Sequence, residues 1–327
     1  MVRIGNTVFE HTPVMLAPME DITDPSFRFL CKRFGADMVF TEFISSDGLI
    51  RDGAKSVKKL DIFDYERPVG IQIYGHIPEA MVAAARIAER AHPDVIDLNF
   101  GCPMRKIARR GAGAGMLRTP NLLVEITRRI VEAVSVPVTV KTRLGWDEEN
   151  KIIVSLARHL QDAGISALTI HGRTGTQMYR GHADWTLIGE VANDPNITIP
   201  IIGNGDIDSP QKAKEMLEKY KVDGLMIGRA AIGRPWIFRQ VKHYLQTGEL
   251  LPEPSLKEKV ELARLHLQKS IEFKEIPRGI YEMRRHFVHY FKNLPGFKPI
   301  RVRLLTTLDT DEIHRILDEI EKKYAGF

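Results

Sequence analysis

The sequence is poor in cysteine, with only Cys31 and Cys102 among 327 residues. Two thiols are too few for a disulfide scaffold, a four-cysteine zinc site or an iron–sulfur cluster held by this chain alone. Long apolar runs are also missing, because none approaches the roughly 18 residues of a membrane-spanning helix. The start, Met1 to Glu10, lacks the charged and then apolar layout of a signal peptide. We therefore expect a protein of the reducing cytoplasm, with no membrane segment and no metal centre.

Acidic residues are scarce in two segments. Residues 278–303 carry seven basic side chains and one acid, Glu282, and residues 105–118 carry five basic side chains and no acid. The bulk of the chain is balanced, since residues 1–238 hold 30 basic and 29 acidic side chains, whereas residues 239–327 hold 17 and 13. A merely solvated helix face usually mixes both signs. The excess favours an anionic partner for the C-terminal part, and the plainer alternative is an amphipathic helix whose charges are only solvated.

Eight short apolar, β-branched runs mark the first part of the chain. They cover residues 14–17, 38–43, 69–74, 95–100, 138–142, 167–170, 199–202 and 224–227, and segments of helical periodicity such as 80–91, 122–134, 152–163 and 211–219 lie between them. Apolar strands alternating with amphipathic helices indicate a parallel sheet covered by helices, and eight such units predict a (β/α)8, or TIM, barrel. The rival is a doubly wound sheet. It usually has a glycine-rich turn after its first strand, where this chain has Pro18-Met19-Glu20.

A second unit follows the barrel. Residues 235–246 read as a helix ending at Gly248, and Leu251-Pro-Glu-Pro-Ser255 reads as a linker. Residues 255–274, 278–291 and 309–324 each carry apolar residues at helical spacing. We predict an α/β fold in which a TIM-barrel domain occupies residues 1–240 and a helical-bundle domain occupies residues 250–327.

In a TIM barrel the active site is built on the loops that follow the carboxyl ends of the strands. Polar residues fall at such positions along this chain, and they are Gln72, Asn99, Cys102, Lys141, Arg143, His171, Asn204, Asp206 and Arg229, with Pro18 and Met19 after the first strand. Barrels commonly bind phosphate after the seventh and eighth strands, where Gly203, Gly205, Gly228 and Gly233 would let the backbone approach an anion. The alternative is that these glycines only relieve crowding at the turns.

Two of these side chains suggest chemistry. Cys102 lies on a loop, where it has three alternative roles: a small buried hydrophobe, a nucleophile or a proton donor. The sequence shows no fixed His/Asp partner, which favours the role of proton donor over that of nucleophile. Lys141 lies inside an apolar strand, where an uncompensated ammonium is costly. It either faces an electron-rich ligand or forms a structural ion pair with an acid such as Asp97. Cys31, within the helical run 27–34, is expected to be a core residue.

Taken together, these residues resemble those of the tRNA-dihydrouridine synthases, a family of flavin-dependent enzymes. The similarity runs from residue 14 to at least residue 238 and continues more loosely through the C-terminal helices. It rests on Ala17-Pro-Met19, Asp97-Leu-Asn-Phe-Gly-Cys-Pro103 with Lys106, Val140-Lys-Thr-Arg143, His171-Gly-Arg-Thr174, Asn204-Gly-Asp206 and Gly228-Arg-Ala230. The stretch Gly233-Arg-Pro-Trp-Ile-Phe238 is similar to the bacterial subgroup labelled B.

The resemblance implies a barrel that carries FMN and a helical domain that grips tRNA. By matching position, Pro18, Met19 and the backbone near Glu20 would line the flavin, Gln72 and Lys141 would bond the isoalloxazine edge, and His171, Asn204, Gly205, Asp206, Gly228 and Arg229 would hold the ribityl phosphate. Cys102 would donate the proton, and Asn99 would contact the target uracil. In the basic C-terminal segment, Arg284, Arg285 and Lys292 are expected to bind the RNA backbone, whereas His286 and His289 predict a solvated or RNA-facing surface rather than a metal site.

Two positions depart from the family pattern. Glu20-Asp21 stands where the family usually has a small residue and a glycine, and Gly175 stands where it often has a basic residue. The first departure is expected to change the loop over the flavin, and the second to remove a basic contact to phosphate or RNA.

The function expected from the resemblance is reduction of the C5–C6 double bond of tRNA uridines to dihydrouridine, with NADPH or NADH as reductant. One rival is another flavin barrel that reduces a small pyrimidine, for which the basic helical tail would be unnecessary. The other is a non-catalytic RNA-binding protein, against which Cys102, Lys141 and the paired glycines speak. The sequence is compatible with a monomer.

Overall fold

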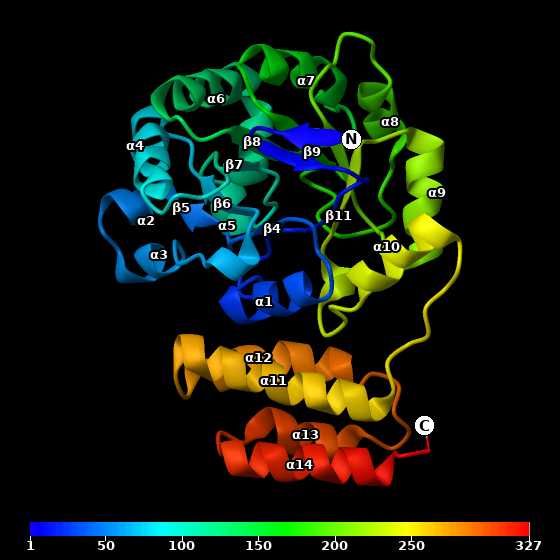
Figure 1. Ribbon diagram of the computed structural model, residues 1–327. Coiled ribbons are helices and arrows are strands. Elements are labelled where there is room, and N and C mark those ends of the chain that lie inside the picture. The colour runs from blue at the N-terminus through cyan, green and yellow to red at the C-terminus, as the bar shows by residue number, and fades with distance from the viewer. Residues whose placement is uncertain (327) are drawn as a thin grey trace.

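The computed structural model of the protein describes residues 1–326, and eight parallel strands form its central barrel (Figure 1). These are β3 (Val14–Leu16), β4 (Val39–Phe40), β6 (Val69–Tyr74), β7 (Val95–Phe100), β8 (Val138–Arg143), β9 (Ala167–His171), β10 (Ile201–Asn204) and β11 (Gly224–Ile227). Each pairs with the next along the chain from β6 onward, and β11 pairs with β3. Backbone bonds between residues 14–16 and 37–38 close the remaining gap, because Leu16 N donates to Met38 O at 2.9 Å and Asp37 N to Val14 O at 3.0 Å. The TIM barrel is confirmed, and the doubly wound sheet is excluded.

All eight expected strands are present, and their apolar runs are buried as a parallel barrel requires. A hairpin of β1 (Val2–Ile4) and β2 (Thr7–Phe9), which the sequence pattern did not reveal, precedes the barrel. Ile4 and Phe9 from this hairpin pack with Met15, Val95 and other side chains inside the barrel. Val95 is the first residue of β7, and Gly5 of the hairpin packs on Pro137, directly before β8, so the hairpin closes the amino-terminal end of the barrel.

Helices cover the outside of the barrel. They are α1 (Pro25–Arg33), α4 (Pro78–Glu89), α6 (Pro120–Ala133), α7 (Ile153–Asp162), α8 (Thr186–Ala192), α9 (Pro210–Tyr220) and α10 (Ile237–Thr247). Four of these helices begin with a proline, which has no amide to leave unpaired in the first turn. Short elements fill two loops: β5 (Ile44–Ser45), α2 (Ser46–Ile50) and α3 (Ala54–Lys58) precede β6, and α5 (Arg105–Ala108) follows β7.

Four C-terminal helices form a separate layer beneath the barrel in Figure 1, with α11 (Leu256–Lys274) and α12 (Arg278–Tyr290) next to it and α13 (Lys298–Thr306) and α14 (Thr310–Lys323) outside. Helix α13 was not expected from the sequence. The four helices have their own hydrophobic core, which also takes in Leu30 of α1 and Trp236. No helix among residues 1–326 is both long and apolar enough to cross a bilayer.

The barrel and the helical layer meet at Phe27. This buried ring of α1 packs on His266 of α11, with centroids 5.8 Å apart, and on His286 of α12, with centroids 4.7 Å apart. Nearby, the Lys274 ammonium lies 2.9 Å from Asp24 and pairs also with Glu282. The expectation that His286 is solvated or faces RNA is therefore wrong, because α1 covers that part of α12 and leaves the side chain only 3% exposed.

Candidate active site

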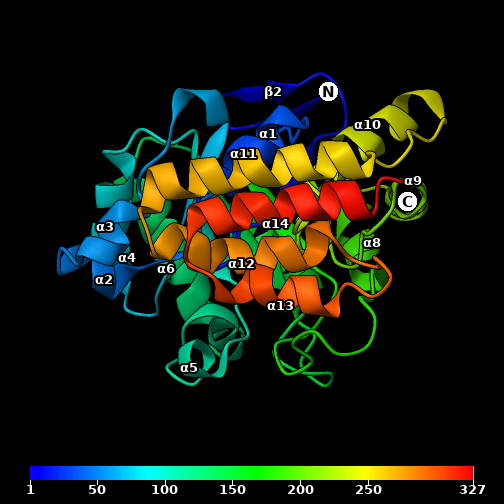
Figure 2. The same cartoon turned by 90° about the horizontal axis from the view of Figure 1, so that it is seen from below.

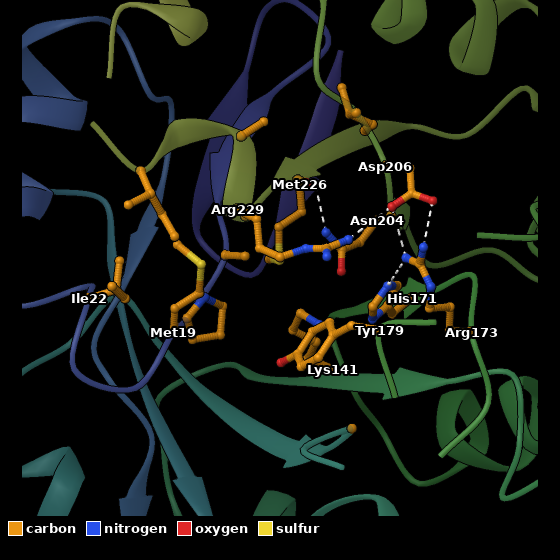
Figure 3. A pocket seen from close by; sticks show the side chains of 18 of the residues that line it. Met19, Ile22, Lys141, His171, Arg173, Tyr179, Asn204, Asp206, Met226 and Arg229 are labelled. Carbon is orange, nitrogen blue, oxygen red and sulfur yellow. Dashed lines mark hydrogen bonds and ion pairs between the residues drawn. The ribbon is translucent and has the colours of Figure 1, made fainter. Parts of the chain in front are cut away.

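A pocket of about 910 Å³ opens at the carboxyl ends of the barrel strands (Figure 3). Its wall contains every residue that the resemblance assigned to the cofactor: Pro18, Met19, Glu20, Gln72, Lys141, His171, Asn204, Gly205, Asp206, Gly228 and Arg229. Asn99, Cys102 and Lys292 line the same pocket, whereas Arg284 and Arg285 are not part of its wall. The fold thus brings together, around one pocket, strand-end residues that lie far apart in the sequence.

Two guanidinium groups converge on Asp206. Arg173 donates to its two carboxylate oxygens at 2.9 and 2.7 Å, and Arg229 donates to one of them at 3.1 Å (Figure 3). Burial disfavours the charge on Asp206, but the hydrogen bonds from Arg173 and from the amide of Ala183 outweigh burial and lower its pKa. Asp206 therefore orients two cations. The remaining N–H groups of Arg173 donate to two backbone oxygens and to His171, so all five are engaged. Arg229 is therefore the cation suited to hold a phosphate.

His171 is neutral in this setting. Burial, reinforced by the charges of Arg143 and Lys141, lowers its pKa well below the ordinary value. Nη1 of Arg173 lies 3.3 Å from its Nε2, and an arginine can only donate. Nε2 is therefore the acceptor, which places the single ring proton on Nδ1.

The four glycines after β10 and β11 divide into two kinds. A Cβ on Gly203 would lie 2.1 Å from the Trp185 ring, and one on Gly233 would lie 2.6 Å from Cβ of His289. For these two the crowding explanation holds. Gly205 has a φ of +128°, a conformation that side chains rarely adopt, and a Cβ there would also lie 2.7 Å from Cβ of Ala183. Gly228 alone is open, with no atom closer than 3.5 Å to its added Cβ. Of the four, Gly205 and Gly228 belong to the pocket wall.

Hydrogen bonds link Asp97 to Cys102 across the opposite wall. Gln72 Nε2 donates to the Asp97 carboxylate at 2.5 Å, and Asn99 Nδ2 donates to Gln72 Oε1 at 2.8 Å. Asn99 Oδ1 accepts from two successive backbone amides at 3.0 and 2.9 Å, and the second belongs to Cys102. Both acceptor positions of the Asn99 oxygen are therefore used, which fixes the Cys102 loop and leaves one N–H for a ligand.

The thiol of Cys102 lines the pocket and is 8% exposed. Burial raises its pKa above the ordinary value, so the sulfur carries its proton at neutral pH. A protonated thiol can give a proton but is a poor nucleophile, since the thiolate is the nucleophilic form. The raised pKa and the place in the pocket wall thus favour the proton donor among the three alternatives. Cys31, in contrast, is fully buried in the core as expected.

The Cys102 loop is held by Arg143. Its Nε donates to Gly101 O at 2.7 Å, and its Nη1 donates to Thr174 O and Met178 O at 2.9 and 2.8 Å. These carbonyls come from the loops after β7 and after β9. One buried guanidinium therefore ties two walls of the pocket together.

Lys141 forms no salt bridge with any residue of the described chain. Asp97, the acid named as its structural partner, instead accepts from Gln72 and from Thr139 Oγ1, the latter at 2.6 Å. The ammonium lines the pocket (Figure 3), and burial together with the charge of Arg143 lowers its pKa to about 8. The ion-pair alternative is wrong, and a cation facing a bound ligand remains.

The two departures from the family pattern have structural causes. Glu20 pairs with Lys59 at 2.6 Å, and burial raises its pKa. Asp21 is taken up by Arg285 of α12, whose Nη2 lies 3.1 Å from its carboxylate. Gly175 packs on Trp146, and a Cβ there would lie 2.9 Å from the indole ring. Trp146 therefore occupies the space that a basic side chain at position 175 would need.

The sequence did not predict that three further residues lie in the pocket wall. Tyr179 is 53% exposed and lies between two cations, with Arg143 and Arg229 at 5.7 and 5.1 Å from its ring centroid (Figure 3). Nothing in the sequence marks it, because it lies in the middle of a long loop. Arg173 belongs to the motif His171-Gly-Arg-Thr174, but the sequence predicts no role for its side chain. His289 of α12, which the sequence predicts to be solvated or to face RNA, is exposed. It lines the pocket wall, where only the packing of the two domains could place it.

Acidic partners neutralise part of the basic C-terminal segment, and one of them, Asp21, comes from the barrel. Arg278 pairs with Glu282, Arg285 with Asp21, and Arg303 with Glu312 and Glu319. Arg284 stacks on Tyr281 at 4.7 Å and donates to Thr306 O at 3.3 Å. Lys292, Lys298 and Arg301 form no ion pair within residues 1–326. Of the three RNA contacts expected here, Lys292 alone is both unpaired and in the pocket wall.

A closed barrel with a neutral histidine, oriented guanidiniums and an unpaired ammonium around one carboxyl-end pocket defines a TIM-barrel enzyme whose pocket is suited to an anionic ligand. The dihydrouridine synthase family model matches residues 15–323. The chain belongs to this family and is a dihydrouridine synthase, an oxidoreductase that works with a flavin.

Bacterial enzymes are among the most similar relatives, and this chain matches them over nearly their whole length. The chain is 43% identical to tRNA-dihydrouridine synthase B of Pseudomonas putida, over 94% of this chain and 91% of that protein. It is 39% identical to a probable tRNA-dihydrouridine synthase of Rickettsia bellii, over 92% of each. Among solved structures, 2-naphthoyl-CoA reductase matches with a TM-score of 0.57 at 14% identity, covering 74% of this chain and 51% of that one. Histamine dehydrogenase from Rhizobium sp. 4-9 matches with a TM-score of 0.56 at 14% identity, covering 76% and 47%. Both structural matches support the barrel fold.

Proposed function

We propose that this protein reduces the C5–C6 double bond of uridine in tRNA, with FMN as its cofactor and NADPH or NADH as reductant. The observation that carries the proposal is that the protonated Cys102 thiol and the unpaired Lys141 ammonium line the same pocket. The relatives' names supply tRNA as the class of substrate. A bound flavin supplies the hydride, so the protein must position two rings and provide an acid.

The donor set fits an FMN. A pocket of about 910 Å³ is large enough for a flavin with a second ring beside it, and its wall is rich in donors. At one end, Arg229, with 55% of its side chain exposed, and the backbone at Gly205 and Gly228 in the pocket wall would hold the phosphate. Lys141 and the remaining N–H of Gln72 would bond the isoalloxazine edge, where positive charge favours added electron density. Met19, Pro18 and the backbone near Glu20 would line the ring.

Cys102 would give its proton to the carbon of uracil that does not receive hydride. Because burial keeps the thiol protonated, the acid is in its competent form at neutral pH. Asn99 fixes the amide of Cys102 and keeps one N–H that can be donated to a uracil carbonyl. Asn99 thus serves both the acid and the substrate.

The RNA contact would involve the helical domain. A uracil in folded RNA must leave its stack before it can enter a pocket of this depth. Lys292 in the pocket wall, with Lys298 and Arg301 on the following segment, would bind phosphates. Arg284 would contribute less than the sequence suggested, and Arg285 is held by Asp21. We assign catalysis to residues 1–240 and tRNA binding to residues 250–327 of a cytoplasmic protein.

The test is to purify the protein, record its visible spectrum, and incubate it with unmodified tRNA and NADPH or NADH. We expect a yellow protein that forms dihydrouridine. A colourless protein that forms none would overturn the proposal. A yellow protein that reduces free uracil but not tRNA would support the small-pyrimidine rival, and RNA binding without any turnover would support the non-catalytic one.

A further inference from the structure

Four cations of the α5 loop have no partner in the part of the chain that the structure describes. Arg105, Lys106, Arg109 and Arg110 are all exposed, and none forms an ion pair or a side-chain hydrogen bond there. No acidic residue occurs between Asp97 and Glu125 to neutralise them from within the segment. This differs from the basic residues of α12 and α13, several of which are paired. We call these four residues the α5 patch.

The α5 patch is fixed next to the proposed acid. The chain leaves Cys102 through Pro103 and Met104 directly into α5, and it returns so that Ala114 N donates to Cys102 O at 2.9 Å. Arg118 braces the base of the loop, because its Nη2 donates to Ala108 O at 2.8 Å and its guanidinium lies 4.5 Å from the Trp146 ring centroid. Figure 2 shows α5 projecting beyond the outline of the barrel.

The chemistry of the patch suits a polyanion. Like charges this close repel one another, and a solvated surface usually relieves that repulsion with interspersed acids. Three of the four are arginines, whose planar fork binds phosphate oxygens in pairs. Met104, at the start of α5, is 48% exposed and lines the pocket, so the surface from the thiol to the patch is continuous.

We propose that the α5 patch is a second binding surface for the RNA backbone, carried by the barrel. This inference rests on the proposed function. The RNA would then be held on two sides of the nucleotide that enters the pocket, by the α5 patch and by Lys292, Lys298 and Arg301. Contacts on both sides would steady the backbone where a base leaves its stack, which costs a few kcal/mol.

The experiment compares two fourfold variants with equal loss of charge. In the test variant, Arg105, Lys106, Arg109 and Arg110 are replaced by Gln. In the control variant, the exposed Arg86, Arg90, Lys219 and Lys221, all of them in the barrel, are replaced by Gln. The affinity for unmodified tRNA is measured over a series of salt concentrations, together with flavin content and flavin reduction by NADPH.

We expect the test variant to bind tRNA more weakly and to lose about 0.7 to 0.9 from the slope of log affinity against log salt for each phosphate contact, or roughly 3 in all. Flavin content and reduction should match the control, because no patch residue lines the pocket. Equal affinity and slope in the two variants would overturn the inference and would point instead to a partner other than RNA. The proposed function would fail separately, through absence of dihydrouridine formation by the unaltered protein.

Discussion

Arg285 of α12 donates to Asp21 across the boundary between the two domains, to the backbone oxygen at 3.0 Å and to the carboxylate at 3.1 Å. Asp21 has a φ of +56° and directly follows Glu20, which lies in the pocket wall. A basic residue that sequence alone assigns to RNA is therefore engaged by the barrel.

The first prediction contrasts two cations of the same segment. Lys292→Gln should weaken tRNA binding and lower the salt slope by about 0.7 to 0.9, because Lys292 is unpaired in the pocket wall. Arg285→Gln should leave the slope close to that of the unaltered protein, since its charge is already matched by Asp21. Binding titrations at several salt concentrations measure both. A larger change of slope in Arg285→Gln than in Lys292→Gln would contradict the assignment.

The second prediction concerns Lys141. Lys141→Gln should shift the potential of the bound flavin to more negative values and slow uridine reduction by about 100-fold, as the loss of one preorganised charge does in other enzymes. Because the pKa of Lys141 is lowered to about 8, the unaltered enzyme loses this charge as pH rises through that value. The difference in potential between the two proteins should therefore narrow at alkaline pH. An equal potential at pH 7 would exclude the role.

The third prediction concerns Cys102. Cys102→Ala should retain flavin and its reduction by NADPH but lower dihydrouridine formation by about 10² to 10⁴, the usual contribution of a general acid. Rapid-reaction measurements separate the two half-reactions. Cys31→Ala is the matched control, since that thiol lies in the core away from the pocket. Unimpaired turnover in Cys102→Ala would remove the assignment, and loss of flavin would indicate a structural role.

The fourth prediction concerns acid stability at the domain interface. Burial lowers the pKa of His266 to about 4 and that of His286 well below its usual value, with Asp24 opposing and Lys274 adding to the shift of His266. The unfolded chain binds these protons near pH 6.5, so the stability that the neutral rings provide is present above pH 6.5 and is lost as pH falls toward 4. His266 alone should account for about 3 kcal/mol of unfolding free energy.

Denaturant unfolding at pH 7 and at pH 4.5 measures this loss. His286→Phe keeps a ring against Phe27 and removes an Nδ1 that is buried without a hydrogen-bond partner. The variant should lose less stability on acidification than the unaltered protein. An identical pH dependence in the two proteins would contradict the prediction.

Much of the barrel follows from the sequence because its signal is local. Each buried strand is a continuous apolar run, and each strand end places its polar residue at the same edge of the barrel. This reasoning located Lys141, His171 and Asn204 without any knowledge of their neighbours. The short hairpin of residues 2–9 was missed because its two strands, of three residues each, include the polar Arg3 and Thr7 and so form no continuous apolar run.

What the sequence could not predict depends on contacts between distant residues. Arg285 and Asp21 are 264 positions apart, so the charge excess of the C-terminal segment could not reveal that this arginine is paired. His286 is buried by Phe27 of another domain. The sequence also could not decide whether Asp97 pairs with Lys141, because only the fold shows that Gln72 and Thr139 donate to its carboxylate instead.

Arg143 limits how this enzyme can be redesigned. Its guanidinium bonds the Gly101 oxygen, next to the acid, and two oxygens of the loop that carries Tyr179. A substitution at Arg143 would therefore displace both the loop of the proposed proton donor and the loop that forms the opposite wall of the pocket. Efforts to broaden the range of accepted nucleotides would do better to vary Met104, whose exposed side chain reaches the pocket without contacting Arg143.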